Sequence, residues 1–152
     1  MQNKITYLRI ILTQDCNLSC AYCHHEGVGK LASRLDPMLA IKIIEACYIA
    51  GMRKFKFIGG EPTLYSDLPS IIGEMSWPDI DISLISNGLF DQSFLAKCLD
   101  AGLDRVNISI HAWDSPKSML LSGMSQNQLS DFFDNIEFLL ARQKVSKFNY
   151  VF

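Results

Sequence analysis

The chain has 152 residues, 49% of them hydrophobic and 20% charged, and its formal net charge at pH 7 is −2. A chain of this length can bury a sizeable core as one domain, and its near-average charge excludes a strongly basic surface built for nucleic acid. The N-terminal apolar run is too short for a signal peptide, and no window reaches the roughly 18 apolar residues of a membrane span. We therefore expect one domain over residues 1–152, located in the cytoplasm, with no nucleic-acid or membrane partner.

Strand-like segments recur along the chain between short turns. Their ranges are 7–13, 54–58, 80–85 and 105–110, and a fifth begins at 148. Along the fourth of them, apolar Val106 and Ile108 alternate with polar Asn107 and Ser109, and the first two show a similar alternation. A sheet covered by helices on both faces would instead have strands that are apolar almost throughout. The pattern predicts a sheet with one apolar face and one polar face.

Helix-like segments lie between these strands. One begins after Asp36 with Pro37 at its first position, two more span 67–75 and 91–101, and the last begins at Ser125, which can form a capping box with Gln128. The apolar face of this last helix is predicted to consist of Leu129, Phe132, Phe133, Ile136, Leu139 and Leu140.

The strand–helix–strand order predicts a parallel sheet with right-handed crossovers. Together with the alternation in the strands, it favours an α/β fold in which a partial parallel (β/α) barrel has about five strands and four helices around a polar lumen. In such a barrel, functional residues gather in the loops after the carboxyl ends of the strands. Unusual residues occur after four strands, in the segments 15–27, 59–62 (GGEP), 86–88 (SNG) and 109–111. We expect these segments to form one site on one rim.

The first of these segments contains Cys16, Cys20 and Cys23 in the spacing C-x3-C-x2-C, with no fourth cysteine nearby. A structural zinc site needs four ligands, which only His24 or His25 could complete. A four-iron cluster held by three cysteines keeps one iron open for a cofactor or substrate. A redox pair of Cys20 and Cys23 would leave Cys16 unexplained. The spacing favours the cluster and leaves the zinc site and the redox pair as alternatives.

These motifs also occur in a recognisable order. C-x3-C-x-aromatic-C, with Tyr22 as the aromatic residue, is followed by GGEP, SNG and the polar strand NISIH. From Leu8 to Phe152 the chain resembles the radical S-adenosylmethionine (SAM) superfamily. The resemblance implies a four-iron (4Fe–4S) cluster that binds SAM and reduces it, which releases a 5′-deoxyadenosyl radical that removes a hydrogen atom from the substrate. It further implies an electron donor as a partner.

The resemblance assigns roles to residues at matching positions. Cys16, Cys20 and Cys23 would ligate the cluster, and the backbone of Tyr22 would meet the adenine of SAM. The remaining SAM contacts would be Gly59, Gly60 and Glu61 near the methionine amino group, with Asn107 and Ser109 on the strand that faces the ribose and carboxylate.

Within the superfamily, LRIILTQDCNLSCAYC most resembles the GTP cyclases of molybdenum cofactor biosynthesis. This resemblance implies that Arg9, Lys56, Ser86 and Lys147 contact the triphosphate of GTP. The strand alternation independently places Arg9 and Lys56 on the polar face, where three converging cations would suit a polyphosphate. The alternatives are that these cations are merely solvated or ion-paired, that the substrate is a peptide, or that the chain is a non-catalytic iron–sulfur or zinc-binding fragment.

The chain departs from the cyclase pattern at several points. It has Lys56 in place of an arginine, Asp15 in place of a basic residue before the first cysteine, and Tyr65 where an arginine is common. The sixth strand and the second cluster of the cyclases have no counterpart, since Cys47 and Cys98 lie on apolar helix faces and are expected to be core thiols. We therefore expect a barrel without its C-terminal part, with an open strand edge available to a second chain or another copy.

Overall fold

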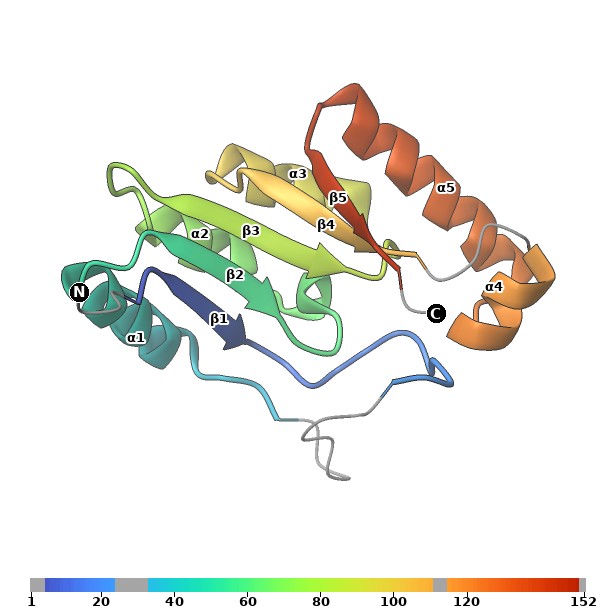
Figure 1. Ribbon diagram of the computed structural model, residues 1–152, viewed down its shortest axis with the longest axis horizontal. Helices are drawn as coiled ribbons and strands as arrows, with labels where there is room; N and C mark the ends of the chain where they lie inside the picture. Colours follow the sequence, from blue (N-terminus) through green and yellow to red (C-terminus); the bar gives the residue numbers. More distant parts are fainter. Residues whose placement is uncertain (1–4, 24–32, 111–114, 151–152) are drawn as a thin grey trace.

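The computed structural model describes residues 5–23, 33–110 and 115–150, and its described strands form one parallel sheet (Figure 1). The strands are β1 (Tyr7–Ile11), β2 (Lys54–Ile58), β3 (Asp81–Ser86), β4 (Arg105–Ser109) and β5 (Val145–Asn149). Their order in the sheet is β1-β2-β3-β4-β5, the same as their order in the chain, and every neighbouring pair is parallel. The carboxyl ends of all five strands therefore meet at one edge of the sheet.

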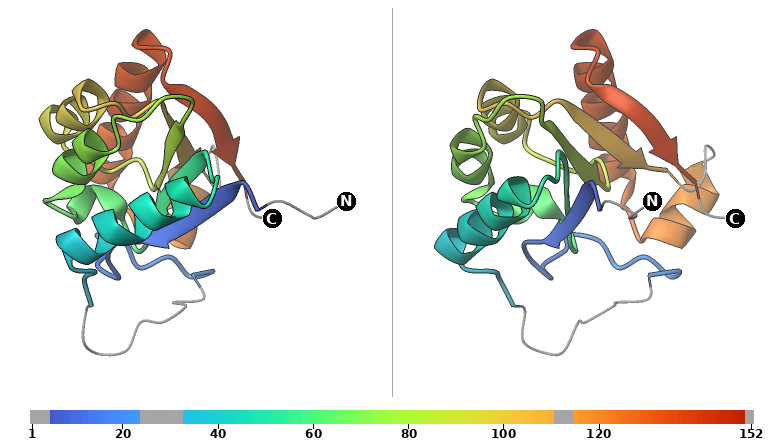
Figure 2. Two further views of the ribbon diagram at one scale, coloured as in Figure 1. Left: turned by 90° about the vertical axis from the view of Figure 1, so that its left-hand side faces the viewer. Right: turned by 60° about the vertical axis from the view of Figure 1, so that its left-hand side comes forward.

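Figure 2 shows helices along one face of the curved sheet. The helical segments are α1 (Pro37–Ile49), the short 3₁₀ helix η1 (Pro62–Leu64), α2 (Leu68–Glu74), α3 (Gln92–Asp100), α4 (Ser115–Ser122) and α5 (Gln126–Ala141). Helices α1, α2, α3 and α5 cover the outer face, while α4 lies beyond the carboxyl ends of the strands. In the parts of the chain that the structure describes, no helix is long and apolar enough to cross a membrane.

Short-range signals fix where the helices begin. The Asp36 carboxylate accepts a hydrogen bond from the Leu39 amide at 2.9 Å, and Pro37 occupies the first helical position of α1. The Asp91 carboxylate caps α3 in the same way, accepting from the Phe94 amide at 2.8 Å. Each cap satisfies an amide that has no partner within the helix, so both helices begin where the sequence predicts.

The two faces of the sheet differ as the strand alternation predicts. Phe55 and Phe57 of β2 are fully buried against the helices, while Lys56 between them points to the other side. Strand pairing sets further residues on the same side as Lys56. We call this side the inner face, and it carries Arg9, Lys56, Ser83, Asn107 and Lys147. The expected partial parallel barrel, with helices outside and polar side chains inside, is confirmed.

Two elements differ from the sequence-based expectation. Helix α4 was not predicted, because SPKSMLLS is short and lacks a clear apolar face. Strand β5 begins at Val145 rather than at residue 148, so Lys147 lies within the strand and does not open it. The chain turns from α5 into β5 within three residues, helped by the positive φ of 54° at Gln143.

The buried face of α5 also differs in part. Phe133 and Leu140 were predicted to be buried, but 37% and 53% of their surfaces are exposed. Asn135 takes a buried position instead, where its side-chain amide donates to the carbonyls of Gly88 and Phe90 at 2.9 Å each. The helix is therefore rotated so that an amide, rather than a wider apolar stripe, meets the loop after β3.

The capping box of α5 gives a first test. The Ser125 hydroxyl accepts from the Gln128 amide at 3.3 Å, and the Gln128 side chain accepts from the Ser125 amide at 2.9 Å. Ser125→Ala removes half of this exchange and is expected to lower the free energy of unfolding by about 1 kcal/mol, measured by urea denaturation.

The matched control is Ser130→Ala, the same chemical change at an exposed position of the same helix. Because alanine has the higher helix propensity, the control is expected to leave stability unchanged or slightly raised. An equal loss in both variants would show that the cap contributes nothing specific.

Candidate functional site

The cysteine loop leaves β1 and returns toward α1, and its two ends pair as a short stem. The Leu35 amide donates to the Leu12 carbonyl at 2.8 Å, and the Gln14 amide donates to the Ser33 carbonyl at 3.1 Å. Thr13 and Arg34 form an antiparallel bridge between these two bonds. The loop that holds Cys16, Cys20 and Cys23 is therefore closed at its base by backbone pairing.

An ion pair reinforces this stem directly before the first cysteine. Arg34 approaches one carboxylate oxygen of Asp15 with two nitrogens, Nε at 2.7 Å and Nη2 at 2.6 Å. The buried Tyr65 donates its hydroxyl to the Leu35 carbonyl at 2.6 Å. Asp15 and Tyr65, two of the departures from the cyclase pattern, thus both hold the stem.

The GGEP segment packs against the same stem through its backbone. The Gly60 amide donates to the Thr13 carbonyl at 2.9 Å, and the Glu61 amide donates to the Asp15 carbonyl at 2.7 Å. A Cβ atom on Gly59 would overlap the Thr13 carbonyl oxygen, and one on Gly60 would overlap that of Asp15. Both positions need glycine because two stretches of backbone touch there.

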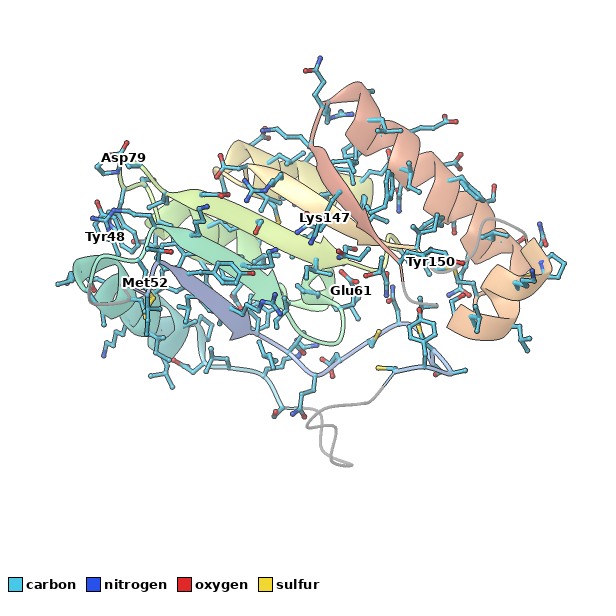
Figure 3. All side chains as sticks on the ribbon, in the orientation of Figure 1. Tyr48, Met52, Glu61, Asp79, Lys147 and Tyr150 are labelled. Carbon is cyan, nitrogen blue, oxygen red and sulfur yellow. The ribbon has the colours of Figure 1, made fainter. Side chains whose placement is uncertain are left out.

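The Glu61 side chain has no exposed surface, and its carboxylate joins the GGEP segment to the SNG segment. One oxygen accepts from the Thr63 amide at 3.1 Å and the Thr63 hydroxyl at 2.7 Å, and the other accepts from the Asn87 amide at 2.7 Å. Burial raises the pKa of Glu61, and these hydrogen bonds offset part of the rise. Figure 3 shows Glu61 among the loops at the carboxyl ends of the strands.

The SNG segment in turn contacts the cysteine loop. The Asn87 side-chain amide donates to the Asn17 side-chain oxygen at 2.7 Å and lies 3.7 Å from the Cys16 sulfur. Asn17 donates to the Leu89 carbonyl at 2.8 Å. Gly88 has a φ of 86°, and a Cβ atom there would strike the Phe132 ring of α5. The cysteine loop, the GGEP segment and the SNG segment, which are far apart in sequence, are therefore joined by hydrogen bonds on one rim. We call this arrangement the interlock.

Helix α4 holds the far end of the cysteine loop. The Ala21 amide donates to the Leu121 carbonyl at 2.8 Å. The next residue, Tyr22, lines a narrow cleft of about 20 Å³, which is room for about one water molecule. The cleft is lined by Leu18, Tyr22, Asn87, Ser109, Ile110, Ser122, Met124 and Phe132. The structure thus places Tyr22 and Ser109 on one cleft, and their contact with SAM stays a prediction.

The three cysteines of the loop are free thiols, with Cys16 and Cys23 exposed and Cys20 half-buried. Burial raises the pKa of Tyr22, and a hydrogen bond to Cys20 and the nearby charges of Cys20, Cys23 and Cys16 raise it further. Burial likewise raises the pKa of Cys16.

Three soft thiolates on one accessible loop suit an iron–sulfur cluster, so the donor set fits the implied group. Among the described residues, no three His, Cys, Asp or Glu side chains are already placed to hold a metal ion. His24 and His25, the only candidates for a fourth zinc ligand, lie outside the described residues. The two remaining cysteines are separate from this loop, since Cys47 packs partly against the core and burial raises the pKa of Cys98 to about 12.

The residues expected to contact substrate fall into three groups. Arg9 and Lys56 are direct register partners on the inner face. Lys147 shares this face but lies on β5, at the opposite edge of the sheet from β1 (Figure 3). Ser86 differs from expectation: it points to the helix side, is buried, and its hydroxyl accepts from the Gly88 amide at 3.0 Å.

The correction for Ser86 has a simple geometric cause. It pairs with Ile108, whose side chain is fully buried against the helices, so its own side chain faces the same layer. There it also hydrogen-bonds Glu61. Ser86 belongs to the interlock of the loops and not to the group of cations on the inner face.

Sequence reasoning missed two residues of the interlock. Asn17 lies between the cysteines without a motif role, and Asn87 was expected at the rim only as part of the SNG segment, without a contact of its own. The sequence does show that Asn17 and Asn87 are polar residues in two conspicuous loops. It does not show that they contact each other, because that contact depends on tertiary structure. Asn107, expected near SAM, is buried on β4 next to the strand end that carries Ser109.

With the thiols, the glycine-rich segment and the polar strand end on one rim of a parallel sheet, the fold and the sequence motifs agree. The chain belongs to the Radical SAM superfamily, whose family model matches residues 10–152.

Relatives within this superfamily are more specific. The chain is 39% identical over 121 residues to a probable GTP 3',8-cyclase of Pyrococcus horikoshii, covering 80% of this chain and 39% of the relative. It is 43% identical over 116 residues to a probable GTP 3',8-cyclase of Methanococcus maripaludis, covering 73% and 38%. The chain thus spans about two fifths of the length of these relatives. Among solved structures, Streptococcus suis SuiB bound to S-adenosylmethionine superposes with a TM-score of 0.72 at 15% identity, covering 95% of this chain and 40% of SuiB.

Replacing Glu61 tests the interlock. In Glu61→Gln one acceptor oxygen becomes an NH₂ group that faces an amide donor, so the free energy of unfolding is expected to fall by about 1–3 kcal/mol. The raised pKa means that the wild-type carboxyl supports folding best at low pH and loses this contribution as pH rises through the raised pKa. The difference in the free energy of unfolding between wild type and Glu61→Gln, measured by chemical denaturation, should therefore become smaller as the pH rises.

Glu137→Gln is the control, because Glu137 is exposed on α5 and its substitution should change stability by less than about 0.5 kcal/mol. Hydrogen exchange adds a local readout, since the Asn87 and Thr63 amides should exchange faster in Glu61→Gln. Unchanged protection at both amides would contradict the role given to the carboxylate.

The Asp15–Arg34 pair is tested by a double-mutant cycle with Asp15→Asn and Arg34→Gln. Because the two side chains are partly exposed, at 24% and 52%, the coupling is expected to be about 0.2–1 kcal/mol and to shrink in high salt. Additive effects of the two substitutions at low salt would show that the pair does not support the stem.

Proposed function

We propose that this chain forms the core of a radical SAM enzyme, with a 4Fe–4S cluster on Cys16, Cys20 and Cys23. The observation that carries the proposal is the interlock at the rim, where these thiols share one loop that is tied to the GGEP segment, the SNG segment and α4. When bound, the cluster supplies the electron that cleaves SAM and yields the radical that takes a hydrogen atom from the substrate. An electron donor is a required partner.

SAM is proposed to bind beside the cluster on this rim. Tyr22 and Ser109 line the narrow cleft there, and Asn107 lies one step below Ser109 on the same face of β4. The GGEP backbone borders the cysteine loop directly, so a ligand at the cluster meets Gly59, Gly60 and Glu61 through main-chain atoms. The Glu61 carboxylate is already occupied by Thr63 and Asn87, so its role is to position the loops.

GTP is the proposed substrate, in the first committed chemistry of molybdenum cofactor biosynthesis. The support is the 39–43% identity to probable GTP 3',8-cyclases and the adjacent cations Arg9 and Lys56 on the inner face. Lys147 on β5 can add a third charge from across the same face. Ser86 would act only indirectly, through the loop that it holds.

Anaerobic reconstitution with iron and sulfide tests the function. The proposal predicts about four iron and four sulfide per chain, an absorption or paramagnetic spectrum that changes on adding SAM, and formation of 5′-deoxyadenosine after reduction. GTP is expected to stimulate 5′-deoxyadenosine formation more than ATP or a short cysteine-containing peptide does.

The matched variants are Cys20→Ala, expected to abolish cluster assembly, and Cys47→Ala, expected to leave it intact because Cys47 is remote on α1. One tightly bound zinc per chain with no spectral response to SAM would contradict the proposal. Stimulation by the peptide and not by GTP would retain the radical enzyme and refute its substrate.

A further inference from the structure

A half-buried tyrosine, Tyr7, lies beside Arg9 and Lys56 on the inner face. Tyr7 and Arg9 are two residues apart on β1, so their side chains share one face, and Lys56 is the register partner of Arg9 on β2. Arg9 Nε donates to the Tyr7 hydroxyl oxygen at 3.1 Å. The guanidinium carbon of Arg9 and the ammonium nitrogen of Lys56 lie 5.5 and 5.6 Å from the centre of the Tyr7 ring.

The tyrosine responds electrostatically to both neighbours. Partial burial acts to raise its pKa, but hydrogen bonds and positive charge from Arg9 and Lys56 outweigh the burial and lower the pKa below its ordinary value. Arg9, through its hydrogen bond, and Lys56, through its position near the ring, therefore both act on the same phenol.

These two cations are not neutralised by carboxylates in the described part of the chain. The ion pairs found there are Arg34 with Asp15 and Arg105 with Asp81. Asp81, the carboxylate on the strand next to β2, is thus already engaged. Two positive charges held together without an anionic partner are a feature of sites that receive an anionic ligand.

The hydrogen bond to Tyr7 also determines which part of Arg9 remains available. It uses Nε, so the two terminal nitrogens Nη1 and Nη2 remain as a planar fork that matches two oxygens of one phosphate group. Lys56 adds a point charge beside the fork, and the Tyr7 hydroxyl, which accepts from its neighbours, still has its own proton to donate.

We propose that Tyr7 is a positioning residue for a polyphosphate subsite, in which it orients the Arg9 fork and keeps Lys56 beside it. The inference rests on the proposed function in taking GTP as the natural ligand, but the chemistry requires only a chain of phosphate groups. It assigns to this face a selectivity for triphosphate over monophosphate, because a triphosphate carries more negative charge and more oxygens that Arg9 and Lys56 can contact together.

Calorimetry of the full chain with inorganic triphosphate, with orthophosphate and with GTP tests the subsite without need of a cluster. Tyr7→Phe keeps the ring and removes the oxygen that holds Arg9 Nε. It is expected to weaken triphosphate binding about 5- to 30-fold, the loss of about one charge-assisted hydrogen bond, and to affect orthophosphate less. Tyr48→Phe is the matched control, since Tyr48 lies on α1, on the face of the sheet opposite the inner face (Figure 2), stacks on Trp77 and should leave binding unchanged.

A second background separates positioning from a general structural effect. Arg9→Lys removes the fork and should itself weaken triphosphate binding by a similar factor. If Tyr7 acts through the fork, Tyr7→Phe in the Arg9→Lys background should cost little more, so the two effects are strongly non-additive. Thermal unfolding of each variant verifies that it is folded, and the Arg9→Lys measurement stands by itself if Tyr7→Phe does not fold.

The outcomes are distinct. Equal triphosphate affinity in Tyr7→Phe, Tyr48→Phe and wild type would overturn the inference, as would additive effects of Tyr7→Phe and Arg9→Lys, or no triphosphate binding by the wild type. Triphosphate binding without any preference for GTP over ATP would uphold the subsite and refute GTP as its ligand. The cluster and SAM experiments are unaffected by any of these results, so failure of the subsite leaves the radical SAM proposal to be judged separately.

Discussion

The arrangement of the rim depends on one buried carboxylate. A carboxyl group without exposed surface must find hydrogen-bond partners within the protein, because a buried polar group left without a partner costs about 1–3 kcal/mol. Glu61 obtains its donors from Thr63 on its own segment and from the Asn87 amide on the next loop. The GGEP and SNG segments are therefore restricted to positions in which the Thr63 and Asn87 amides donate to Glu61. Since the Glu61 amide is bonded to Asp15, the start of the cysteine loop is fixed by the same residue.

This constraint changes how the glycine-rich segment is understood. Its glycines would be expected where a ligand approaches closely, yet Gly59 and Gly60 are required even without one, because the stem of the cysteine loop lies against them. A segment that is fixed by the fold presents the same main-chain groups before and after a ligand arrives. Such preorganisation lowers the cost of binding, since the loop does not have to be ordered by the ligand. Packing and binding are thus two consequences of the same local sequence.

The sequence predicts features that depend on neighbouring residues better than features that depend on contacts between distant parts of the chain. Strand β2, the cap at Asp36 and the capping box at Ser125 were predicted correctly because strand alternation and capping are local. Helix α4 and the buried Asn135 were missed because both exist through contacts with loops distant in sequence. At the site, spacing alone placed the cysteines on one rim. It could not reveal which side of β3 Ser86 faces or that Asn17 meets Asn87, since register and loop packing decide both.

Strand β1 links the two halves of the proposed mechanism. Its alternation directs Arg9 to the inner face and Ile10, which is 6% exposed, into the core, and the chain then continues into the cysteine loop. A slip of one residue against β2 would turn Arg9 toward the helices and expose Ile10, at a large cost in buried apolar area. The hydrophobic core therefore fixes the register of β1, and with it the face to which Arg9 points and the place where the chain enters the loop of Cys16. Burial of Ile10 between the sheet and the helices is therefore what directs the neighbouring Arg9 to the inner face.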